Sequence, residues 1–323
     1  MDQRALPRRI ARRIRTLPAQ MATIALNTPM LEKRLTEAYE RARTLHKPKL
    51  QPLSPADTAI VAGLERNGVH ITTLDALAMP GTEAMWEPAV ALASTFAGCA
   101  ARGEYARQYM VQAGADDLMR HPEIVRWGLN ERILNIVEAY LGLPASYDAL
   151  NMFYTVADGA QVASRKWHRD VEDRRMVKVI VYLHDVCIGT GPLEILHRGF
   201  PGSDRLAGSN YPVLTHETLE QRLGGALEDG DATTCTGLAG TVIFADVASH
   251  YHRGRPATAR DRCALFYNYF SRVPLRPFFC QRHVFSRAQL AEIAEGLPAR
   301  ARDCLLWHKR LPWIAKLVPP APL

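Results

Sequence analysis

The stretch WHRDVEDRRMVKVIVYLHDVCIGTGPLEIL, residues 167–196, decides the fold. His168 and Asp170 lie two positions apart, shortly before an apolar segment, residues 176–183, that is typical of a buried strand. Residues i and i+2 of an extended chain point to the same face, so both side chains can reach one point on the inner side of a sheet. An imidazole and a carboxylate are two of the three ligands of a two-histidine, one-carboxylate iron(II) site, which leaves coordination positions open for substrates.

A third ligand is predicted downstream. Residues 240–246, GTVIFAD, indicate a turn into a buried strand, and His250 and His252 follow at its far end. Both histidines are expected to face one side of a strand, so they compete for the role of distal ligand. The HRG context and the ten-residue spacing to Arg262 favour His252, and His250 is then expected to support a ligand from behind.

Two cations could bind an anionic cosubstrate at such a site. Arg262 opens the next apolar strand, residues 263–270, and its planar fork suits a buried carboxylate. That carboxylate is expected to be the distal one of 2-oxoglutarate, whose keto acid end chelates iron. Lys178 lies between two valines, an even number of residues after His168 and Asp170, so in a strand its side chain would face the same side as theirs. It is either a second buried cation that needs a partner or an edge-strand residue that extends to water, and both interpretations stay open.

The composition is that of a globular protein. The 323 residues are 47% hydrophobic and 23% charged, and no apolar run approaches the roughly 18–20 residues of a membrane span. The six cysteines are widely spaced and form no CxxC pair, which favours a reducing compartment. We therefore expect a soluble, cytoplasmic protein. The chain has no GxGxxG or GxxxxGK[ST] motif, so nothing favours a dinucleotide or P-loop site.

The positive charge is concentrated at the N-terminus. Residues 1–50 carry 12 Lys and Arg against 4 Asp and Glu, whereas the remainder carries 28 against 29. Within this extension, Leu6, Ile10, Ile14 and Leu17 follow helical spacing between arginines. Such a basic helix could contact a membrane surface, a nucleic acid or another partner, but a solvated helix that packs a few leucines on the body is the favoured interpretation. No nucleic-acid partner is expected, because the body is nearly neutral.

The order of elements predicts an α+β architecture. Helices are expected at residues 31–45, 55–67, 85–101 and 121–141, followed by strands at 147–155, 176–183, 240–245 and 263–270, with a loop at 199–231. Two short helices, 287–295 and 299–309, come last. Helices followed by strands favour a jelly roll, divided into a basic helical extension (1–50), a catalytic domain (51–285) and a helical tail (286–323). Three further histidines have no partner pattern and are expected in the core or on the surface: His184, His197 and His216. Asp173 could bind substrate or orient a ligand, but a solvated loop acid is the favoured interpretation.

Taken together, WHRD, the lysine-bearing strand that ends YLHDV, GPLEI, GTVIFAD, HRG and the strand-opening arginine resemble the phytanoyl-CoA dioxygenase-like family over residues 53–282. The resemblance implies a double-stranded β-helix (jelly-roll, cupin-like) fold and an Fe(II)- and 2-oxoglutarate-dependent dioxygenase that uses O2. By position it makes His168, Asp170 and His252 the metal ligands and Arg262 the 2-oxoglutarate anchor.

The same resemblance implies hydroxylation of a small-molecule or lipid-like substrate, because halogenating relatives lack the carboxylate. The sequence departs from the family at residues 197–204, HRGFPGSD, where members often have a Pro-Gly-Ser-His run, so the substrate cannot be transferred. Two alternatives of other classes are a non-catalytic jelly-roll protein that binds a metal or ligand, and a nucleic-acid-associated protein that acts through the basic arm.

Overall fold

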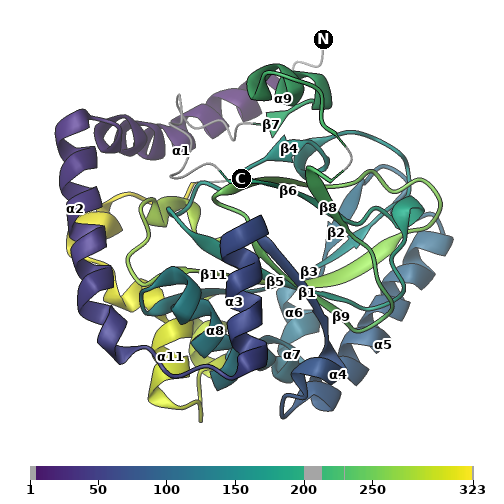
Figure 1. The fold of residues 1–323 in the computed structure, drawn as a ribbon. Helices are drawn as coiled ribbons and strands as arrows, with labels where there is room; N and C mark the ends of the chain where they lie inside the picture. The colour runs from purple at the N-terminus through teal and green to yellow at the C-terminus, as the bar shows by residue number, and fades with distance from the viewer. Residues whose placement is uncertain (1–4, 200–212, 229, 322–323) are drawn as a thin grey trace.

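Two antiparallel sheets form the centre of the molecule (Figure 1). The computed structural model describes residues 5–199, 213–228 and 230–321, with side chains from residue 16 onward except that of residue 314. The larger sheet has the order β1-β9-β5-β11-β3-β2 and the smaller one β7-β4-β10-β6-β8. The strands are β1 (Val69–Thr73), β2 (Met110–Gln112), β3 (Ala145–Thr155), β4 (Trp167–His168), β5 (Met176–Tyr182), β6 (Leu193–Gly199), β7 (Val213–Leu214), β8 (Ala232–Cys235), β9 (Thr241–Asp246), β10 (His250–Gly254) and β11 (Arg262–Ser271). This is the α+β jelly roll that the sequence predicts.

Strand β5 shows how the larger sheet separates two environments. Its neighbours are β9 and β11, so it is a central strand whose backbone groups are paired on both sides. The odd-numbered Val177, Val179 and Val181 belong to the main hydrophobic core. The even-numbered positions, which include Met176 and Ile180, face the space between the sheets. The alternation follows from the period of two residues in a strand.

Helices cover the outer face of the larger sheet and complete the main core. Their bounds are α3 (Pro55–Asn67), α4 (Leu74–Leu77), α5 (Thr82–Ala101), α6 (Ala115–Met119), α7 (Pro122–Trp127), α8 (Glu131–Leu141), α10 (Arg287–Ile293) and α11 (Ala299–Leu305). In the view of Figure 1, α4, α7, α8 and α11 lie below the strands, α3 stands in front of them and α5 lies on the right. Helix α3 begins as expected, since Ser54 Oγ accepts a hydrogen bond from Asp57 N at 3.1 Å and Pro55 occupies the first turn.

The single helix expected at residues 121–141 is wrong, because the chain breaks it into α7 and α8 at Gly128. A Cβ at Gly128 would lie 2.5 Å from the Tyr267 ring, and the Gly128 carbonyl accepts a hydrogen bond from Tyr269 Oη at 2.6 Å. Asn130 then caps α8 by accepting from Arg132 N at 2.9 Å. The break therefore depends on tyrosines of a distant strand, which helical periodicity cannot reveal.

The expected loop at residues 199–231 also needs correction. It contains the short strand β7 and the helix α9 (His216–Leu223), whose side chain Leu219 is buried beside Trp167 and Tyr251. The altered family segment at 197–204 falls mostly outside the described residues, which resume at residue 213. Of that segment, His197 Nε2 lies 2.6 Å from Thr233 Oγ1.

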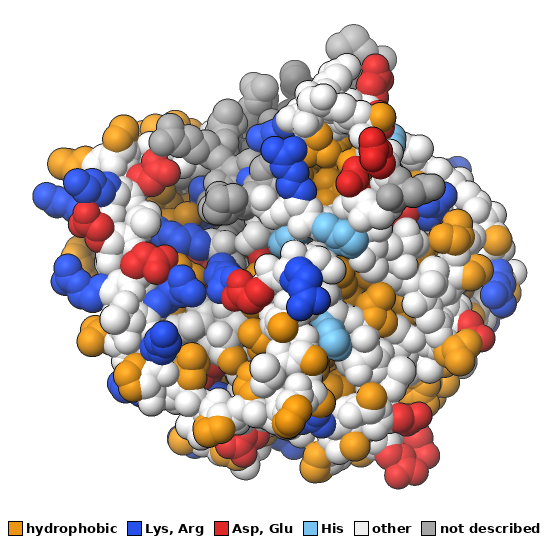
Figure 2. Space-filling view, in the orientation of Figure 1, with side chains coloured by type: hydrophobic (Ala, Val, Ile, Leu, Met, Phe, Trp, Pro, Cys, Tyr) orange, Lys and Arg blue, Asp and Glu red, His pale blue; other side chains and the backbone are white. Residues whose placement is uncertain are grey.

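The N-terminal extension is helical, as expected, in α1 (Ala5–Leu26) and α2 (Pro29–His46). The predicted apolar and basic faces of residues 6–15 lie outside the described side chains. Farther along α1, Ala19 packs against Val171, Phe278 and Phe279. Figure 2 shows charges of both signs on the side of the molecule that α2 occupies in Figure 1, and Lys33 and Arg43 pair with Glu37 and Glu40. None of the described helices is both long and apolar enough to cross a membrane.

The C-terminal helices belong to the core of the molecule. Leu290, Ile293 and Leu305 contribute to the main hydrophobic cluster together with residues of the larger sheet. The division into three parts at residues 50 and 285 stays a prediction. After α11, His308 lies in a 3-10 turn beside Trp307 and is buried.

His308 predicts a dependence of stability on pH. Burial, with Arg287 and Lys309 nearby, lowers the pKa of His308 to about 4, against 6.5 for an ordinary histidine. Between these values the unfolded chain takes up a proton that the folded chain does not, so the free energy of unfolding falls as the pH falls from 6.5 to 4. The decrease is on the order of 1 kcal/mol, since solvent screens part of the shift. Chemical denaturation at several pH values should show that His308→Gln removes this part of the slope; identical slopes would contradict the assignment.

Candidate metal centre

Three potential metal ligands converge between the two sheets. His168 on β4 and His252 on β10 are directly paired across the smaller sheet, and their rings lie 4.3 Å apart. Asp170 follows β4 and is fixed by a hydrogen bond from its backbone N to Val247 O at 2.7 Å. Asp170 Oδ1 lies 3.9 Å from His168 Nε2 and 3.8 Å from His252 Nε2. Among the described residues, these three buried side chains form the one group whose donor atoms could hold a metal ion, all within 4.8 Å of one another.

Backbone carbonyl groups orient both imidazole rings. His168 Nδ1 donates to Lys166 O at 2.8 Å, and His252 Nδ1 donates to His250 O at 3.2 Å. A carbonyl oxygen can only accept, so the proton of each neutral ring is on Nδ1 and the lone pair of Nε2 points toward the cluster. Burial lowers the pKa of both histidines, most strongly that of His252, where His168 acts in the same direction. Both rings are thus held in the neutral form that binds metals.

Asp170 is held as a carboxylate. Burial alone would raise its pKa, but the charge of Lys178 beside it holds the pKa of Asp170 well below its usual range. Lys178 Nζ makes direct contact with Asp170 Oδ2. Lys178 stands on the central strand β5 and its side chain is only 21% exposed, so the alternative of an edge-strand lysine that extends to water is wrong.

The three side chains open into a cavity of about 490 Å³ between the sheets. The inward positions of β5, β11 and β3 line it, and these include Lys178 and Arg262. Arg262 is buried and donates to Gly191 O. Burial lowers the pKa of Arg262, partly offset by Tyr182. Thus the structure brings all five predicted site residues to one cavity: His168, Asp170, Lys178, His252 and Arg262.

His250 lies elsewhere, which corrects the expectation that it shares a side with His252. The register between β10 and β6 shifts between these two histidines, so the simple alternation of a strand does not apply. His250 Nδ1 donates to Leu196 O at 2.7 Å, and its ring fits against Gly68 and Gly199. His250 supports the site through its backbone, since its carbonyl is the acceptor that orients His252.

Asp173 was expected to be a solvated loop acid, and that expectation is wrong. It is fully buried, and its carboxylate accepts hydrogen bonds from Ser271 N at 2.9 Å, Leu275 N at 3.1 Å and Arg174 N at 2.8 Å. Asp173 therefore links the segment that follows β4 to the end of β11 through hydrogen bonds.

Removing this carboxylate should destabilise the protein. Asp173→Ala leaves the buried amides of Ser271 and Leu275 without acceptors, and we expect the free energy of unfolding to fall by about 3 kcal/mol. Urea denaturation measures this change. Asp75→Ala, at an exposed position, is the control and should change stability by less than about 0.5 kcal/mol. Equal stability of the two variants would contradict the role given to Asp173.

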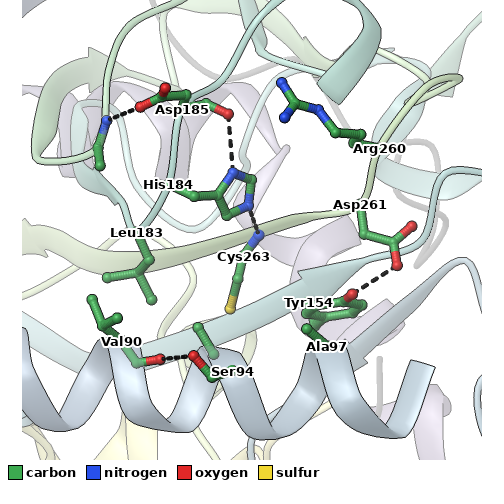
Figure 3. A pocket seen from close by; sticks show the side chains of 12 residues that line it. Val90, Ser94, Ala97, Tyr154, Leu183, His184, Asp185, Arg260, Asp261 and Cys263 are labelled. Atoms are coloured by element: carbon green, nitrogen blue, oxygen red, sulfur yellow. Dashed lines mark hydrogen bonds between the residues drawn. The ribbon is translucent and has the colours of Figure 1, made fainter. Parts of the chain in front are cut away.

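A second hollow of about 820 Å³ lies between α5 and the ends of β5 and β11 (Figure 3). His184 sits there with its polar atoms satisfied, because Nδ1 donates to Asp185 O at 3.0 Å and Nε2 accepts from Cys263 N at 2.8 Å. Asp261 likewise accepts from Tyr154 Oη at 2.7 Å. His184 thus has a structural role, as the sequence predicts. Among the described residues, those that line this hollow form no group that could hold a metal ion.

Sequence reasoning missed three charged residues of the first cavity: Asp148, Glu172 and Arg282. Glu172 is buried and forms an ion pair with Arg282 Nε at 2.6 Å. Glu172 could have been noticed, since it continues the i, i+2 series of His168 and Asp170. Nothing local in the sequence marks Asp148 or Arg282.

No family model and no curated protein matches the chain. Among solved structures it is similar to EctD from S. alaskensis, solved with 2-oxoglutarate and 5-hydroxyectoine (18% identity, TM-score 0.42, 68% of this chain and 77% of that one). It is also similar to the epimerase SnoN, solved with Fe3+, alpha ketoglutarate and nogalamycin RO (18%, 0.39, 67% and 84%). A third is HygX from Streptomyces hygroscopicus, with nickel and 2-oxoglutarate bound (15%, 0.40, 68% and 88%). These identities and TM-scores are too low to transfer a reaction or a substrate.

The chain's own geometry gives the class of the site. Two buried imidazoles and one buried carboxylate meet inside a jelly roll, with their donor atoms toward a shared cavity. The protein therefore carries, on a jelly-roll fold, the two-histidine, one-carboxylate set that is typical of non-haem iron(II) oxygenases.

Proposed function

We propose that this protein is an Fe(II)- and 2-oxoglutarate-dependent dioxygenase of the phytanoyl-CoA dioxygenase-like family that hydroxylates a C–H bond of a small molecule. The single observation that carries the proposal is the convergence of His168, Asp170 and His252 at one cavity whose wall also carries cationic side chains, among them the buried Arg262. The sequence resemblance supports the family, and the cavity supports a substrate of small-molecule size, since such sites occupy roughly 300–1,000 Å³.

The residues present fit a metal ion. His252 Nε2 is buried and has no hydrogen-bond partner among the described residues, although it points to a carboxylate and a second imidazole. An unpaired buried nitrogen is costly, and an ion bound there would satisfy it. Two neutral imidazoles and one carboxylate are the donor set that suits iron(II) and leaves positions open for other ligands.

Each residue then has a role. His168, Asp170 and His252 would hold the iron, which with 2-oxoglutarate and O2 supplies the oxidising power for C–H hydroxylation and yields succinate and CO2. Arg262 would bind the distal carboxylate of 2-oxoglutarate. Its Nε is buried and has no hydrogen-bond partner among the described residues, so it can donate to that carboxylate.

Lys178 is the second candidate for this carboxylate. In its present position it neutralises Asp170, and a metal ion would take over that task. Lys178 would then be able to turn toward an anionic cosubstrate in the same cavity.

Succinate formation tests the proposed function. Anaerobically purified protein is supplied with Fe(II) and 2-oxoglutarate, then exposed to O2, and succinate is quantified by mass spectrometry. We expect slow, uncoupled succinate release without a primary substrate, and none when a chelator removes the iron. No succinate from protein shown to bind Fe(II) and 2-oxoglutarate would favour the alternative of a non-catalytic binding protein. Succinate release that persists with the chelator would contradict the role given to iron.

A further inference from the structure

Strand β3 changes the direction of its side chains in the middle of the cavity wall. Asn151, Phe153 and Thr155 face the cavity, so an even-numbered residue of the same strand should face the helices. Asp148 nevertheless lines the cavity. The register between β3 and β11 shifts at this point, and Ala149 adopts a φ of +54°, which few residues other than glycine do.

This irregularity has the form of a β-bulge that redirects one side chain. On its far side Tyr147 points to the helices, where its hydroxyl donates to Val125 O at 3.1 Å. Asp148 accordingly takes the opposite, inward direction and is only 3% exposed. The chain therefore places a carboxyl group in the cavity wall at a position where regular alternation would not put one.

One oxygen of this carboxyl is left for a ligand. Asp148 Oδ2 accepts from Arg282 N at 3.0 Å, whereas Oδ1 is buried and has no hydrogen-bond partner among the described residues. The only basic side-chain atom within 4.0 Å of it, in the described part of the chain, is His283 Nε2 at 4.0 Å. Burial lowers the pKa of His283 to about 4, so this ring is neutral near pH 7 and supplies no charge.

The other acids of the cavity are already compensated. Asp170 contacts Lys178, and Glu172 pairs with Arg282 at 2.6 Å. Arg262 is assigned to 2-oxoglutarate. Among the described acids that line this cavity, Asp148 is thus the one with no Lys or Arg nitrogen within 4.0 Å. Burial raises the pKa of Asp148 well above its usual range, so its carboxylate form needs a cation brought beside it. Farther along the sheet the cavity wall is mostly apolar and includes Met110, Phe153, Ile180 and Phe266.

We propose that Asp148 is the substrate-anchoring residue and that the substrate is a compact molecule with an apolar body and a protonated amine or similar cationic nitrogen, which Asp148 Oδ1 binds. The identification of this ligand as the substrate rests on the proposed function. The size follows from the cavity, since its roughly 490 Å³ must also hold 2-oxoglutarate. The Gln112–Asn151 pair, joined by a 2.6 Å hydrogen bond, provides further amide groups on the same wall.

The test compares two probes that differ only in the polar group, cyclohexylmethylamine and cyclohexylmethanol. Their affinities are measured by ligand-observed NMR titration on full-length, EDTA-treated protein. We expect the amine to bind at least about tenfold more tightly than the alcohol, and Asp148→Asn to weaken the amine about tenfold while leaving the alcohol unchanged. Asp75→Asn, which removes an exposed carboxylate, should change neither affinity.

Stability measurements separate binding from a structural role. In Asp148→Asn the amide oxygen can still accept from Arg282 N, so the melting temperature should stay at or above that of the wild type. Asp148→Leu serves as the second variant should the first fail to fold. Amine affinity that is equal in wild type and variants, an alcohol bound as tightly as the amine, or no amine binding at millimolar concentration would overturn the proposal. Because neither iron nor 2-oxoglutarate is present, these outcomes are independent of the succinate measurement.

Discussion

Replacement of Asp170 by alanine is expected to abolish 2-oxoglutarate turnover and to weaken Fe(II) binding by at least about 100-fold. The loss of a supporting group behind a ligand already costs roughly 10–100-fold in metal affinity, and Asp170 is assigned as a ligand itself. It is also the only carboxylate in the three-residue group. Isothermal titration with Fe(II) under anaerobic conditions, together with succinate quantification, measures both effects.

The control concerns Lys178, which would lose its carboxylate partner in this variant. Asp170→Ala leaves the largely buried Lys178 without its carboxylate, so the single variant should also be less stable. The double variant Asp170→Ala/Lys178→Met removes the stranded charge and should regain stability without regaining activity. Iron-dependent succinate release by either well-folded variant would show that the ligand assignment is wrong.

Replacement of Arg262 by alanine is expected to raise the KM for 2-oxoglutarate by about 100-fold with a smaller change in kcat. Truncation of one partner of a buried charge pair costs roughly 2–5 kcal/mol. Arg262 is buried, lines the cavity and has an Nε without a hydrogen-bond partner among the described residues. The effect should fall mainly on KM, because the distal carboxylate binds away from the reacting atoms. Initial rates over a range of 2-oxoglutarate concentrations provide the measurement.

Arg260 is the matched control for this variant. It stands two residues earlier, is exposed, and lines the separate hollow shown in Figure 3. Arg260→Ala should leave the KM unchanged. If Arg262→Ala also leaves the KM unchanged while Lys178→Ala raises it, then Lys178 is the anchor for the carboxylate instead.

The sequence predicts which side chains meet at the cavity for two reasons, local alternation in the extended segments and the HRG context with its spacing to Arg262, which favours His252. His168 and Asp170 share a face through the period of an extended chain, and Lys178 follows the same parity along β5. His252 follows from the strand that ends at residue 246. The order of elements, with helices before strands, favours an α+β or jelly-roll architecture over a doubly wound sheet, and the family resemblance implies the double-stranded β-helix.

The predictions fail where a distant contact changes the local pattern. The register shift in β10 separates His250 from His252, and the bulge in β3 turns Asp148 inward. Gly128 ends a helix because tyrosines of β11 occupy the space above it. Asp173 is buried because the end of β11 offers amides to its carboxylate. None of these contacts leaves a periodic signal in the residues that it affects.

The most direct test of the central claim is anomalous diffraction from crystals grown anaerobically with Fe(II) and 2-oxoglutarate, with data collected on both sides of the iron absorption edge. We expect one strong anomalous peak in the cavity, in contact with His168 Nε2, the Asp170 carboxylate and His252 Nε2. A peak at another place in the molecule, or none at full iron loading, would contradict the assignment of these three side chains as the metal centre.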